Sequence, residues 1–394
     1  MKKNVLILVE NLPVPFDRRV WMEANTLQSN GYQVHIICPN SKKYPLLREE
    51  IDGIRIYRYP SLIEGRSSLG TLVEYGWAIL AIGLISLLLS ATRKFAVVQV
   101  CNPPDILFMA TWAPRFFWRA KLIFDQHDIN PELWESKGHS MNDLFGKLLL
   151  WAERATYRRA DVVISTNESY KEIAIKRGGK PAEDVFVVRS APKRSFAVVD
   201  LPATRPADEA KKVVYIGTMG HQEGIDILLN AIRLLISTHN LKDIQLDLIG
   251  DGPERRNLED LSLALGLERN VTFHGRVSDA DLRRIVLDAD VAVNPDRPSK
   301  MNDLSSMNKI VEYMALGRPI VQFECVEGER TALEASIGVP GSDAHSLAKV
   351  LSQLLWNQKK RIEMSQFGLQ RFQDSLAWEY QESNLLVSYQ YALS

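Results

Sequence analysis

The sequence predicts an α/β fold of two doubly wound, Rossmann-like domains that face each other across a cleft. Two observations lead to this prediction. Short apolar runs alternate with amphipathic segments along most of the chain, which is the pattern of parallel strands joined by helices. The alternation also stops near residue 194 and restarts near residue 212. The 394 residues suffice for two domains, each with a core of its own.

The first domain is expected to span residues 1–195. Its opening run, "NVLILV", is too short for a signal peptide and no small-residue cleavage site follows, so we interpret it as the first strand. The expected strands are 4–9, 33–38, 54–58, 96–100, 121–125, 161–165 and 185–188. The most evident helices are 17–30, 69–92, 142–159 and 168–177.

A linker is expected at 194–212, where periodicity is lost and Pro, Ala and charged residues increase. The second domain, 210–374, then repeats the strand–helix alternation, and its ligands should bind at the carboxyl ends of its strands. The long aromatic helix expected at 375–393 could cross back onto the first domain. The other expected elements are strands 212–217, 244–250, 271–275, 289–295 and 319–323, helices 224–239, 253–265 and 279–290, and a helix from about 345.

The stretch "NDLSSMNKIVEYMALGRPIV", residues 302–321, predicts a helix with a polar first turn. Ser305 or Ser306 would cap its start, and Gly317 suits the left-handed residue beyond its end. Asn308 and Glu312 lie one turn apart on one side, either as a solvated face or as part of an anion site at the helix start. The residues of the buried stripe would be Met307, Ile310, Val311 and Met314.

One segment is unusually apolar. Residues 75–92, "YGWAILAIGLISLLLSAT", carry no charge and are followed by Arg93 and Lys94. Three interpretations stay open: a buried core helix, a helix that docks on a membrane surface, and a membrane span. The flanking strands favour the first two, because strands of one sheet cannot lie on opposite sides of a bilayer.

The composition is that of an ordinary soluble α/β protein, with 46% apolar and 24% charged residues. Lys plus Arg equals Asp plus Glu, 48 each, so bulk charge does not predict nucleic-acid binding. The cysteines, Cys38, Cys101 and Cys325, are odd in number, far apart and without metal-ligand spacing. Buried reduced thiols in a cytoplasmic protein are therefore expected, and neither a metal nor a cofactor is.

Six stretches, in this order and spacing, together resemble family-4 retaining glycosyltransferases of the GT-B fold, and the resemblance covers nearly the whole chain. The two stretches from the first half are similar to a bacterial subgroup that builds O-antigen and exopolysaccharide units. The stretches are "PFDRRVWMEANTLQSNGYQVHIICP", "IFDQHDINPEL", "YIGTMGHQEGIDILLNAI", "LIGDGPERRNLEDLSLALGLERNVTFHGRV", "DADVAVNPD" and "NKIVEYMALGRPIV".

The resemblance implies a nucleotide-sugar donor site in the second domain. Glu312 matches the family's glutamate that accepts from the ribose hydroxyls. Lys309 would be a counter-charge for the diphosphate or would point to solvent. The diphosphate would be held by the backbone N–H groups of Ser305, Ser306 and Met307. The other expected donor neighbours are Gly217, and Arg276 and Val277 for the base.

The sequence departs from the family at two places. The usual first glutamate, eight positions before Glu312, is Leu304 here, with Asp303 beside it. Either Asp303 serves as a catalytic group through a shifted loop, or this donor-sugar contact is absent. The usual Arg and Lys after the first strand of the second domain are also missing. Phosphate charge would then come from Lys309, Lys300 or Arg297, while His221 and Glu223 stand in the loop itself.

His127 is the expected catalytic residue of the first domain. By resemblance it contacts the donor sugar near the reacting carbon, and the alternatives are a structural hydrogen bond or a metal cluster. Acidic residues crowd the same loop, but no Asp-x-Asp motif suggests a metal nucleotide site, and GT-B enzymes work without metal. Arg18 and Arg19 begin a helix after the first strand, either as an ordinary salt-bridged start or as a contact to a phosphate of acceptor or donor.

These features together predict a metal-independent, retaining glycosyltransferase for cell-surface polysaccharide. It would move a hexose or aminosugar from a nucleotide sugar, of UDP type, to a lipid-linked or glycan acceptor. It would be cytoplasmic and peripheral on the inner membrane, with contact through 75–92. The alternatives are a GT-B-fold sugar-nucleotide epimerase and a non-catalytic nucleotide-sugar-binding protein.

Overall fold

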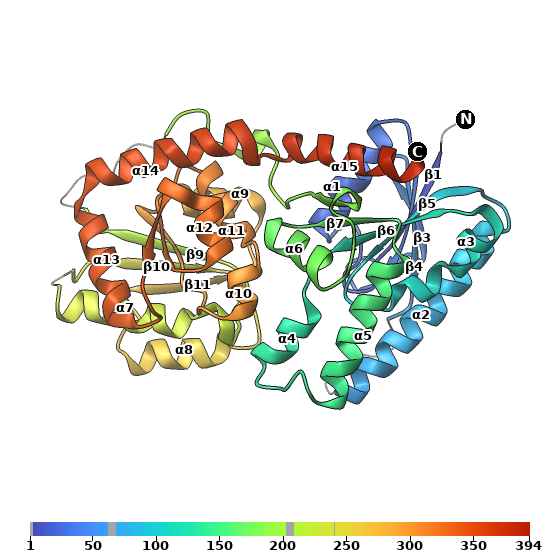
Figure 1. The fold of residues 1–394 in the computed structure, drawn as a ribbon. Coiled ribbons are helices and arrows are strands. Elements are labelled where there is room, and N and C mark those ends of the chain that lie inside the picture. The colour runs from blue at the N-terminus through green and yellow to red at the C-terminus, as the bar shows by residue number, and fades with distance from the viewer. Residues whose placement is uncertain (1–2, 62–67, 202–208, 240) are drawn as a thin grey trace. The chain divides into compact units, whose positions relative to one another are not determined.

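The computed structural model describes residues 3–61, 68–201, 209–239 and 241–394, so part of the expected linker, 202–208, lies outside the described residues. The chain divides into two compact units, each with one sheet of its own (Figure 1). We use "first unit" for Met1–Ser190 with Gln381–Ser394, and "second unit" for Ala191–Tyr380.

The sheet of the first unit has the strand order β3-β4-β2-β1-β5-β6-β7-β8 and is parallel except for β3. The order reverses between β1 and β5, and such switch points are where doubly wound sheets bind ligands. The charged edge strand β3, "REEI", was not predicted, because an exposed edge needs no apolar run. The strands are β1 Asn4–Leu8, β2 Gln33–Pro39, β3 Arg48–Ile51, β4 Ile54–Tyr59, β5 Phe95–Cys101, β6 Lys121–Gln126, β7 Val162–Ser165 and β8 Val185–Val187.

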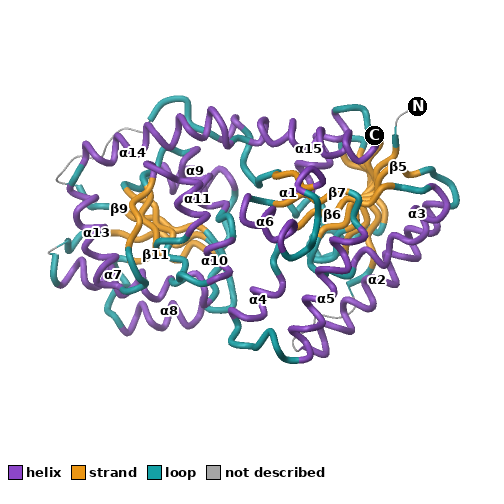
Figure 2. The backbone as a smooth tube through the Cα atoms, in the orientation of Figure 1, coloured by secondary structure: helices purple, strands orange, loops and turns teal. Residues whose placement is uncertain are grey.

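Helices lie on the faces of this sheet (Figures 1 and 2), and the four that the sequence predicts all form within two residues of the expected bounds. The helix α15, Trp378–Leu393, contributes Gln381 onward to the first unit, where Leu385 and Tyr389 are fully buried. The other helices are α1 Arg18–Ser29, α2 Ser68–Ser90, η1 Leu107–Thr111, α3 Trp112–Trp118, α4 Asn130–Ser136, α5 Leu144–Arg159 and α6 Glu168–Lys176, with a short 3-10 turn at η2 Ala182–Asp184. The 3-10 turn η3, Arg194–Phe196, belongs to the second unit.

Helix α2 contains the apolar segment 75–92, and only one side of it is buried. Ile82 is fully buried against the sheet, whereas Leu80, Leu84 and Leu88 are 71%, 59% and 62% exposed. A wholly buried core helix is therefore excluded. By length and composition α2 is the one helix among the described residues that could cross a membrane. It nevertheless packs on strands β2 and β4, so it is an integral part of the first unit.

The sheet of the second unit has the order β11-β10-β9-β12-β13-β14 and is entirely parallel in its described pairs. This is the Rossmann order, with the switch point between β9 and β12. The strands are β9 Lys212–Ile216, β10 Gln245–Ile249, β11 Val271–Gly275, β12 Val291–Asn294, β13 Ile320–Phe323 and β14 Ser336–Val339. The helices are η4 His221–Glu223, α7 Ile225–Ser237, α8 Arg255–Ala264, α9 Asp279–Leu287, α10 Lys300–Leu304, α11 Asn308–Ala315, α12 Val326–Ala332, η5 Leu333–Ala335, α13 Ala344–Trp356, α14 Gln358–Arg371 and the π-helical turn η6 Phe372–Leu376.

Candidate active site

A buried ion-paired group lies at the carboxyl ends of β1, β5 and β6 in the first unit. Asp125 is the fifth residue of β6, and the chain turns back so that His127 Nε2 lies 2.6 Å from Asp125 Oδ2. From the start of α1, the Arg19 guanidinium donates to both carboxylate oxygens, at 2.7 and 3.3 Å. Asp125 is fully buried, and the His127 side chain is 18% exposed.

The charges in this group decide the protonation state of His127. Burial lowers the pKa of its imidazole, but the adjacent Asp125 carboxylate outweighs burial and raises that pKa to about 9. Burial also raises the pKa of Asp125, but Arg19 and His127 outweigh it and hold the pKa well below its usual range. The imidazole is therefore cationic at neutral pH. With Nε2 directed at Asp125, its Nδ1–H is the second donor.

A second layer of polar residues surrounds this group. Gln99 on β5 donates through Nε2 to Glu23 at 2.7 Å and to Asp125 at 3.2 Å. Gln99 in turn accepts a short hydrogen bond from the Tyr389 hydroxyl of α15. Burial and the nearby Asp125 charge raise the pKa of Glu23 to about 8, although Arg19 Nη2 lies 3.2 Å away. Together, the hydrogen bonds from Arg19, His127 and Gln99 hold the Asp125 carboxylate in place.

The loop that carries His127 is held by Asn102. The Asn102 side-chain oxygen accepts from the backbone N–H of His127 at 2.6 Å and of Asp128 at 3.2 Å. Its Nδ2 donates to the Asp105 carboxylate and to the Asp128 carbonyl, both at 2.8 Å. Asn130 donates to the other Asp105 oxygen at 2.7 Å. One amide therefore joins the His127 loop to the segment that contains Asp105.

Two of the acidic residues near His127 have other surroundings. Glu132 turns to Arg177, which donates to both of its oxygens at 2.5 and 3.0 Å, and Arg177 also pairs with Glu153. This cluster ties α4, α5 and α6 together and is structural. Asp128 stays at the His127 loop, where burial raises its pKa. Of the clustered acids, only Asp125 contacts the imidazole.

Of the two roles expected for Arg19, the structure shows the salt-bridged helix start. Arg19 is buried and its donors are directed to Asp125, Glu23, the Val188 carbonyl and Ser190. Arg18, the residue before it, is exposed. Successive residues of a helix point about 100° apart, so Arg19 can be buried while Arg18 faces solvent. Asp17 caps this helix by accepting from the Val20 N–H.

One group of potential metal ligands lies here among the described residues, formed by Cys101, Asp125 and His127. Their ligand atoms lie within 4.8 Å of one another. However, the Arg19 guanidinium bonds to both Asp125 oxygens, and burial raises the pKa of the Cys101 thiol well above its usual value. A cation would therefore meet a fixed positive charge and a neutral thiol, which makes this a poor metal site.

In the second unit, Gly217 and Lys309 meet at the β9–β12 switch point. Lys309 Nζ donates to Asp296 Oδ1 at 2.7 Å and lies 4.8 Å from the centre of the Tyr215 ring. A Cβ on Gly217, at φ +154°, would lie 3.4 Å from Lys309 Cε. The Lys309 side chain is 11% exposed, so it does not point to solvent, and its charge is already paired with Asp296.

The predicted serine cap on the 302–321 helix is wrong, because the stretch forms two helices. Ser305 ends α10: its hydroxyl donates to the Met301 carbonyl at 2.7 Å and its N–H to the Asn302 carbonyl. Met307 is the N-cap of α11, and its own side chain makes no capping hydrogen bond. The α11 start therefore suits an anion, but Ser305 does not contribute its N–H. At the other end, Gly317 at φ +59° confirms the expected left-handed residue.

The remaining predicted residues of the second unit are distributed around this region. Glu312 is half-buried on α11, one turn after Asn308, and Asp303 is half-buried on α10. Arg276 is exposed and Val277 half-buried, directly after β11. Arg297, offered as a phosphate ligand, instead donates to Asp226 at 2.5 Å. The remaining donor candidates are Ser306 and Met307, both half-buried at the α11 start, and Lys300, exposed at the first position of α10.

Two Rossmann-like units, one with a buried His–Asp–Arg group, define the class as a two-domain α/β protein with doubly wound sheets. Residues 17–190 match the family described as glycosyl transferase 4-like domain, and residues 210–357 match glycosyl transferases group 1. Each unit therefore contains a glycosyltransferase domain, the 4-like domain in the first and the group 1 domain in the second.

Individual relatives are distant. The chain is 26% identical over 254 residues to α-D-kanosaminyltransferase of Streptomyces kanamyceticus, covering 60% of this chain and 64% of that enzyme, which is less than two thirds of its length. It is 25% identical over 325 residues to chitobiosyldiphosphodolichol β-mannosyltransferase of Candida albicans, covering 78% and 70%. Anabaena HepE in complex with UDP-glucose superposes with a TM-score of 0.72 at 14% identity, covering 98% and 99%.

Sequence reasoning missed several residues that organise the site, namely Glu23, Gln99, Asn102, Asp296 and Tyr389. One signal was present: Arg19 and Glu23 stand four residues apart on the buried side of a helix, where charged residues occur mainly in pairs. Gln99 likewise interrupts an apolar strand. The partner of each lies far away in sequence, so no local pattern could identify it.

Proposed function

We propose that this protein is a retaining, metal-independent glycosyltransferase that moves a sugar from a UDP-type donor to a lipid-linked acceptor. The observation that carries the proposal is the cationic His127, held by Asp125 and Arg19 in a glycosyl transferase 4-like domain. By the resemblance of its motifs, we place the reaction in the assembly of bacterial cell-surface polysaccharide such as O-antigen, with a hexose or aminosugar as the transferred unit.

The chemistry that suits these residues is front-face displacement. The bond from the sugar anomeric carbon to the diphosphate oxygen breaks, and a bond from the same carbon to the acceptor oxygen forms on the same face. The acceptor hydroxyl proton goes to the departing diphosphate. The Nδ1–H of imidazolium His127 would donate to a sugar hydroxyl and orient the donor sugar. The negative charge that develops lies on the departing diphosphate, where helix-end N–H groups would stabilise it.

The donor would bind in the second unit. The start of α11, at Met307 and Asn308, would present backbone N–H groups to the diphosphate, and the Ser306 backbone lies directly before it. Glu312 would accept from the ribose hydroxyls, and Arg276 and Val277 would lie beside the base. Because Asp296 neutralises Lys309, we expect this helix start to carry most of the phosphate binding. The fold similarity to the UDP-glucose complex of HepE is compatible with this donor class.

The acceptor would be presented by a membrane. Large apolar residues are exposed on α2, η1, α3 and α5 of the first unit, and we call this set the apolar face. Exposed cations on α5, Lys147, Arg154 and Arg158, accompany it and complement anionic lipid headgroups. The relative from Candida albicans is named for a diphosphodolichol acceptor. The residues of the apolar face are Val73, Leu80, Leu84, Leu88, Met109, Trp112, Phe116, Phe117, Leu144, Leu148 and Trp151.

The test is transfer of radiolabelled sugar from a panel of nucleotide sugars to a lipid extract of bacterial membranes. We expect a labelled lipid product with a UDP-sugar, at a rate unchanged by EDTA. His127→Ala should reduce turnover by a factor of about 100 or more, as for loss of one transition-state donor, while UDP affinity stays near wild type.

Three results would contradict the proposal. Interconversion of the nucleotide sugar without transfer would identify an epimerase. Tight UDP-sugar binding without any reaction would identify a binding protein. Wild-type turnover in His127→Ala would give the imidazole a purely structural role.

A further inference from the structure

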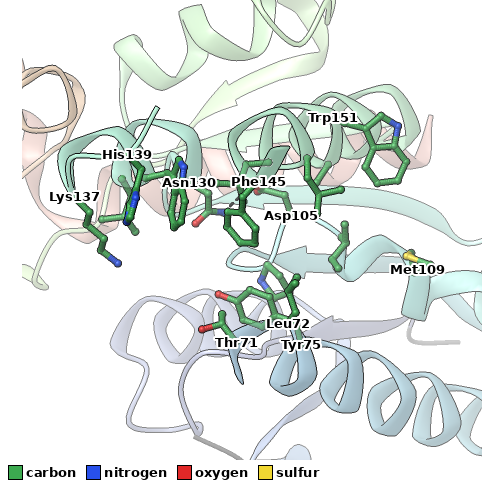
Figure 3. Close-up of a pocket in the computed structure, with 17 residues that line it drawn as sticks. Thr71, Leu72, Tyr75, Asp105, Met109, Asn130, Lys137, His139, Phe145 and Trp151 are labelled. Carbon is green, nitrogen blue, oxygen red and sulfur yellow. Dashed lines mark hydrogen bonds between the residues drawn. The ribbon is translucent and has the colours of Figure 1, made fainter. Parts of the chain in front are cut away.

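We propose that a pocket within the first unit binds the hydrocarbon chain of the acceptor lipid next to its phosphate linkage. This rests on the proposed function and adds the location and chemical class of the acceptor site. The pocket lies between α2 and α5, with α4 at one end, and its volume is about 510 Å³ (Figure 3). Pockets of roughly 300–1,000 Å³ enclose most of a drug-sized ligand.

The lining of the pocket is amphiphilic. In Figure 3, Met109 and Trp151 lie at one end, and Lys137 and His139 lie at the other. The walls between them are formed by aromatic and aliphatic side chains, including Phe145 and Tyr75. An apolar trough with the Lys137 ammonium and the His139 ring at one end complements an anionic amphiphile, because the chain is removed from water while the phosphate meets a positive charge and a hydrogen-bond donor.

The apolar end is continuous with the apolar face. Met109, Leu148 and Trp151 line the pocket and are also 52%, 42% and 56% exposed. A chain could therefore pass from a bilayer into the pocket without crossing water. A soluble sugar would gain nothing from an apolar opening, because it has little apolar surface to bury. The continuity of the pocket with the apolar face therefore favours a lipid as the occupant.

The inner wall connects the pocket to the His127 loop. Asp105 and Asn130 line the pocket, and Asn102 bonds to Asp105 and to the backbone N–H of His127. Both Asp105 oxygens accept from amide groups, so this carboxylate is satisfied from within the protein. The pocket therefore shares part of its wall with the hydrogen bonds that hold the His127 loop.

The cationic end is built on α4. The His139 ring stacks on Trp134 with centroids 3.8 Å apart, and Trp134 packs against Phe145 at 4.6 Å. Trp134 also donates to Asp143, the residue that caps α5. The position of His139 is therefore tied to the pocket wall, while its edge and the Lys137 ammonium remain exposed to a phosphate.

The experiment measures binding of farnesyl phosphate and of farnesol to the full chain by calorimetry, without donor. Wild type should bind the phosphate on the order of tenfold more tightly than the alcohol, because only the phosphate makes charge-assisted contacts. The double variant Lys137→Ala with His139→Ala should lose that preference and still bind farnesol.

Two further variants test the apolar part. Leu149→Trp fills the pocket, and Trp151→Glu places a charge at its exposed opening, so both should weaken binding of both ligands at least tenfold. Leu84→Ser, on the apolar face but outside the pocket, should bind as wild type does. Melting temperatures show whether each variant is folded. If Leu149→Trp unfolds, Trp151→Glu still tests the pocket, because Trp151 is exposed and its replacement should not disturb the core.

The assignment would be overturned if Leu149→Trp and Trp151→Glu both bind farnesyl phosphate as the wild type does. It would also be overturned if the wild type binds a lipid-free oligosaccharide and Leu149→Trp abolishes that binding. Absence of farnesyl phosphate binding, with transfer to a lipid-free acceptor intact, would refute the pocket and leave the glycosyltransferase function standing. If the ligands and variants bind as predicted but no sugar is transferred from any nucleotide sugar, the pocket assignment would stand and the glycosyltransferase function would be refuted.

Discussion

At the scale of single residues, the protonation of His127 is set by one neighbour. Because Asp125 raises the imidazole pKa to about 9, turnover should be steady through neutral pH and fall as pH rises through about 9. In Asp125→Asn the attraction disappears and burial remains, so the falling limb should move to about pH 6.5 or below. A pH–rate profile of kcat measures this shift.

The same pKa has a consequence for stability. The folded-state pKa of His127 lies above its unfolded value of about 6.5, so its ion pair contributes fully below that pH and is lost as pH rises through about 9. His127→Gln should therefore flatten the decline of melting temperature between these two pH values. An unchanged pH–rate profile in Asp125→Asn would show that the carboxylate does not control the imidazole.

Glu312 is the residue on which the donor assignment depends. Glu312→Ala should weaken binding of free UDP by roughly 1–3 kcal/mol, because a charged acceptor for the ribose hydroxyls is removed. Calorimetry measures the change, with Glu334→Ala, an exposed glutamate of η5 in the same unit, as the control. Equal UDP affinity in wild type and Glu312→Ala would remove the carboxylate from the nucleotide site.

At the scale of elements, sequence patterns predicted the helices and strands whose positions depend on local hydrophobic periodicity. The strands around 4–9 and 121–125 form because apolar runs of that length can be buried in a parallel sheet. The helix predicted to start at Ser305 or Ser306 and to end before Gly317 forms as α11, but its N-cap is Met307, because the Ser305 hydroxyl closes α10. A hydroxyl can bond backwards or forwards along the chain, so the residue type did not determine the direction.

Helix α2 gives a prediction of its own. Leu80→Lys, Leu84→Lys and Leu88→Lys should change the free energy of unfolding by only about 0.5 kcal/mol, since these positions are exposed. Each should weaken binding to anionic vesicles by up to about 1.5–3 kcal/mol, the partitioning of a large apolar side chain. Liposome flotation with and without salt, alongside melting curves, measures both effects.

Buried or half-buried positions on α2 serve as controls. Ile82→Lys should unfold the first unit, because Ile82 is fully buried. From sequence alone Trp77 would have been grouped with the tolerant positions, but it is half-buried and its Nε1–H donates to the Pro60 carbonyl at 2.9 Å, so Trp77→Lys should destabilise. Wild-type protein that never floats with anionic vesicles would end the membrane assignment of α2.

At the scale of the whole molecule, the sequence predicted the fold class well and the site only in part. The alternation of strands and helices is repeated many times, so single errors do not alter the architecture. The His127 environment depends instead on contacts such as Gln99 to Tyr389, which join residues 290 positions apart. The spacing of residues along the sequence does not indicate such long-range contacts. The pocket is equally non-local, because its walls come from four different helices.

Helix α15 can be tested at this scale. Tyr389→Phe removes the hydroxyl that bonds to Gln99 and leaves a buried acceptor unsatisfied, which should cost about 1–3 kcal/mol. Calorimetry should show a lower melting temperature for the first unit and an unchanged one for the second. Tyr391→Phe, at a 40% exposed site on the same helix, is the control and should have little effect. Equal destabilisation of both units would contradict a role confined to the first.

The return of residues 381–394 to the first unit also bears on how the protein is made. A ribosome synthesises residues 191–380 before it reaches the segment that covers Gln99. The first unit must therefore wait, with part of its core uncovered, while the entire second unit emerges and can already fold. Domains normally fold in order of synthesis. Here the first unit, which is synthesised first, should complete its folding last. Its apolar surface should therefore stay exposed longest to a chaperone that binds nascent chains.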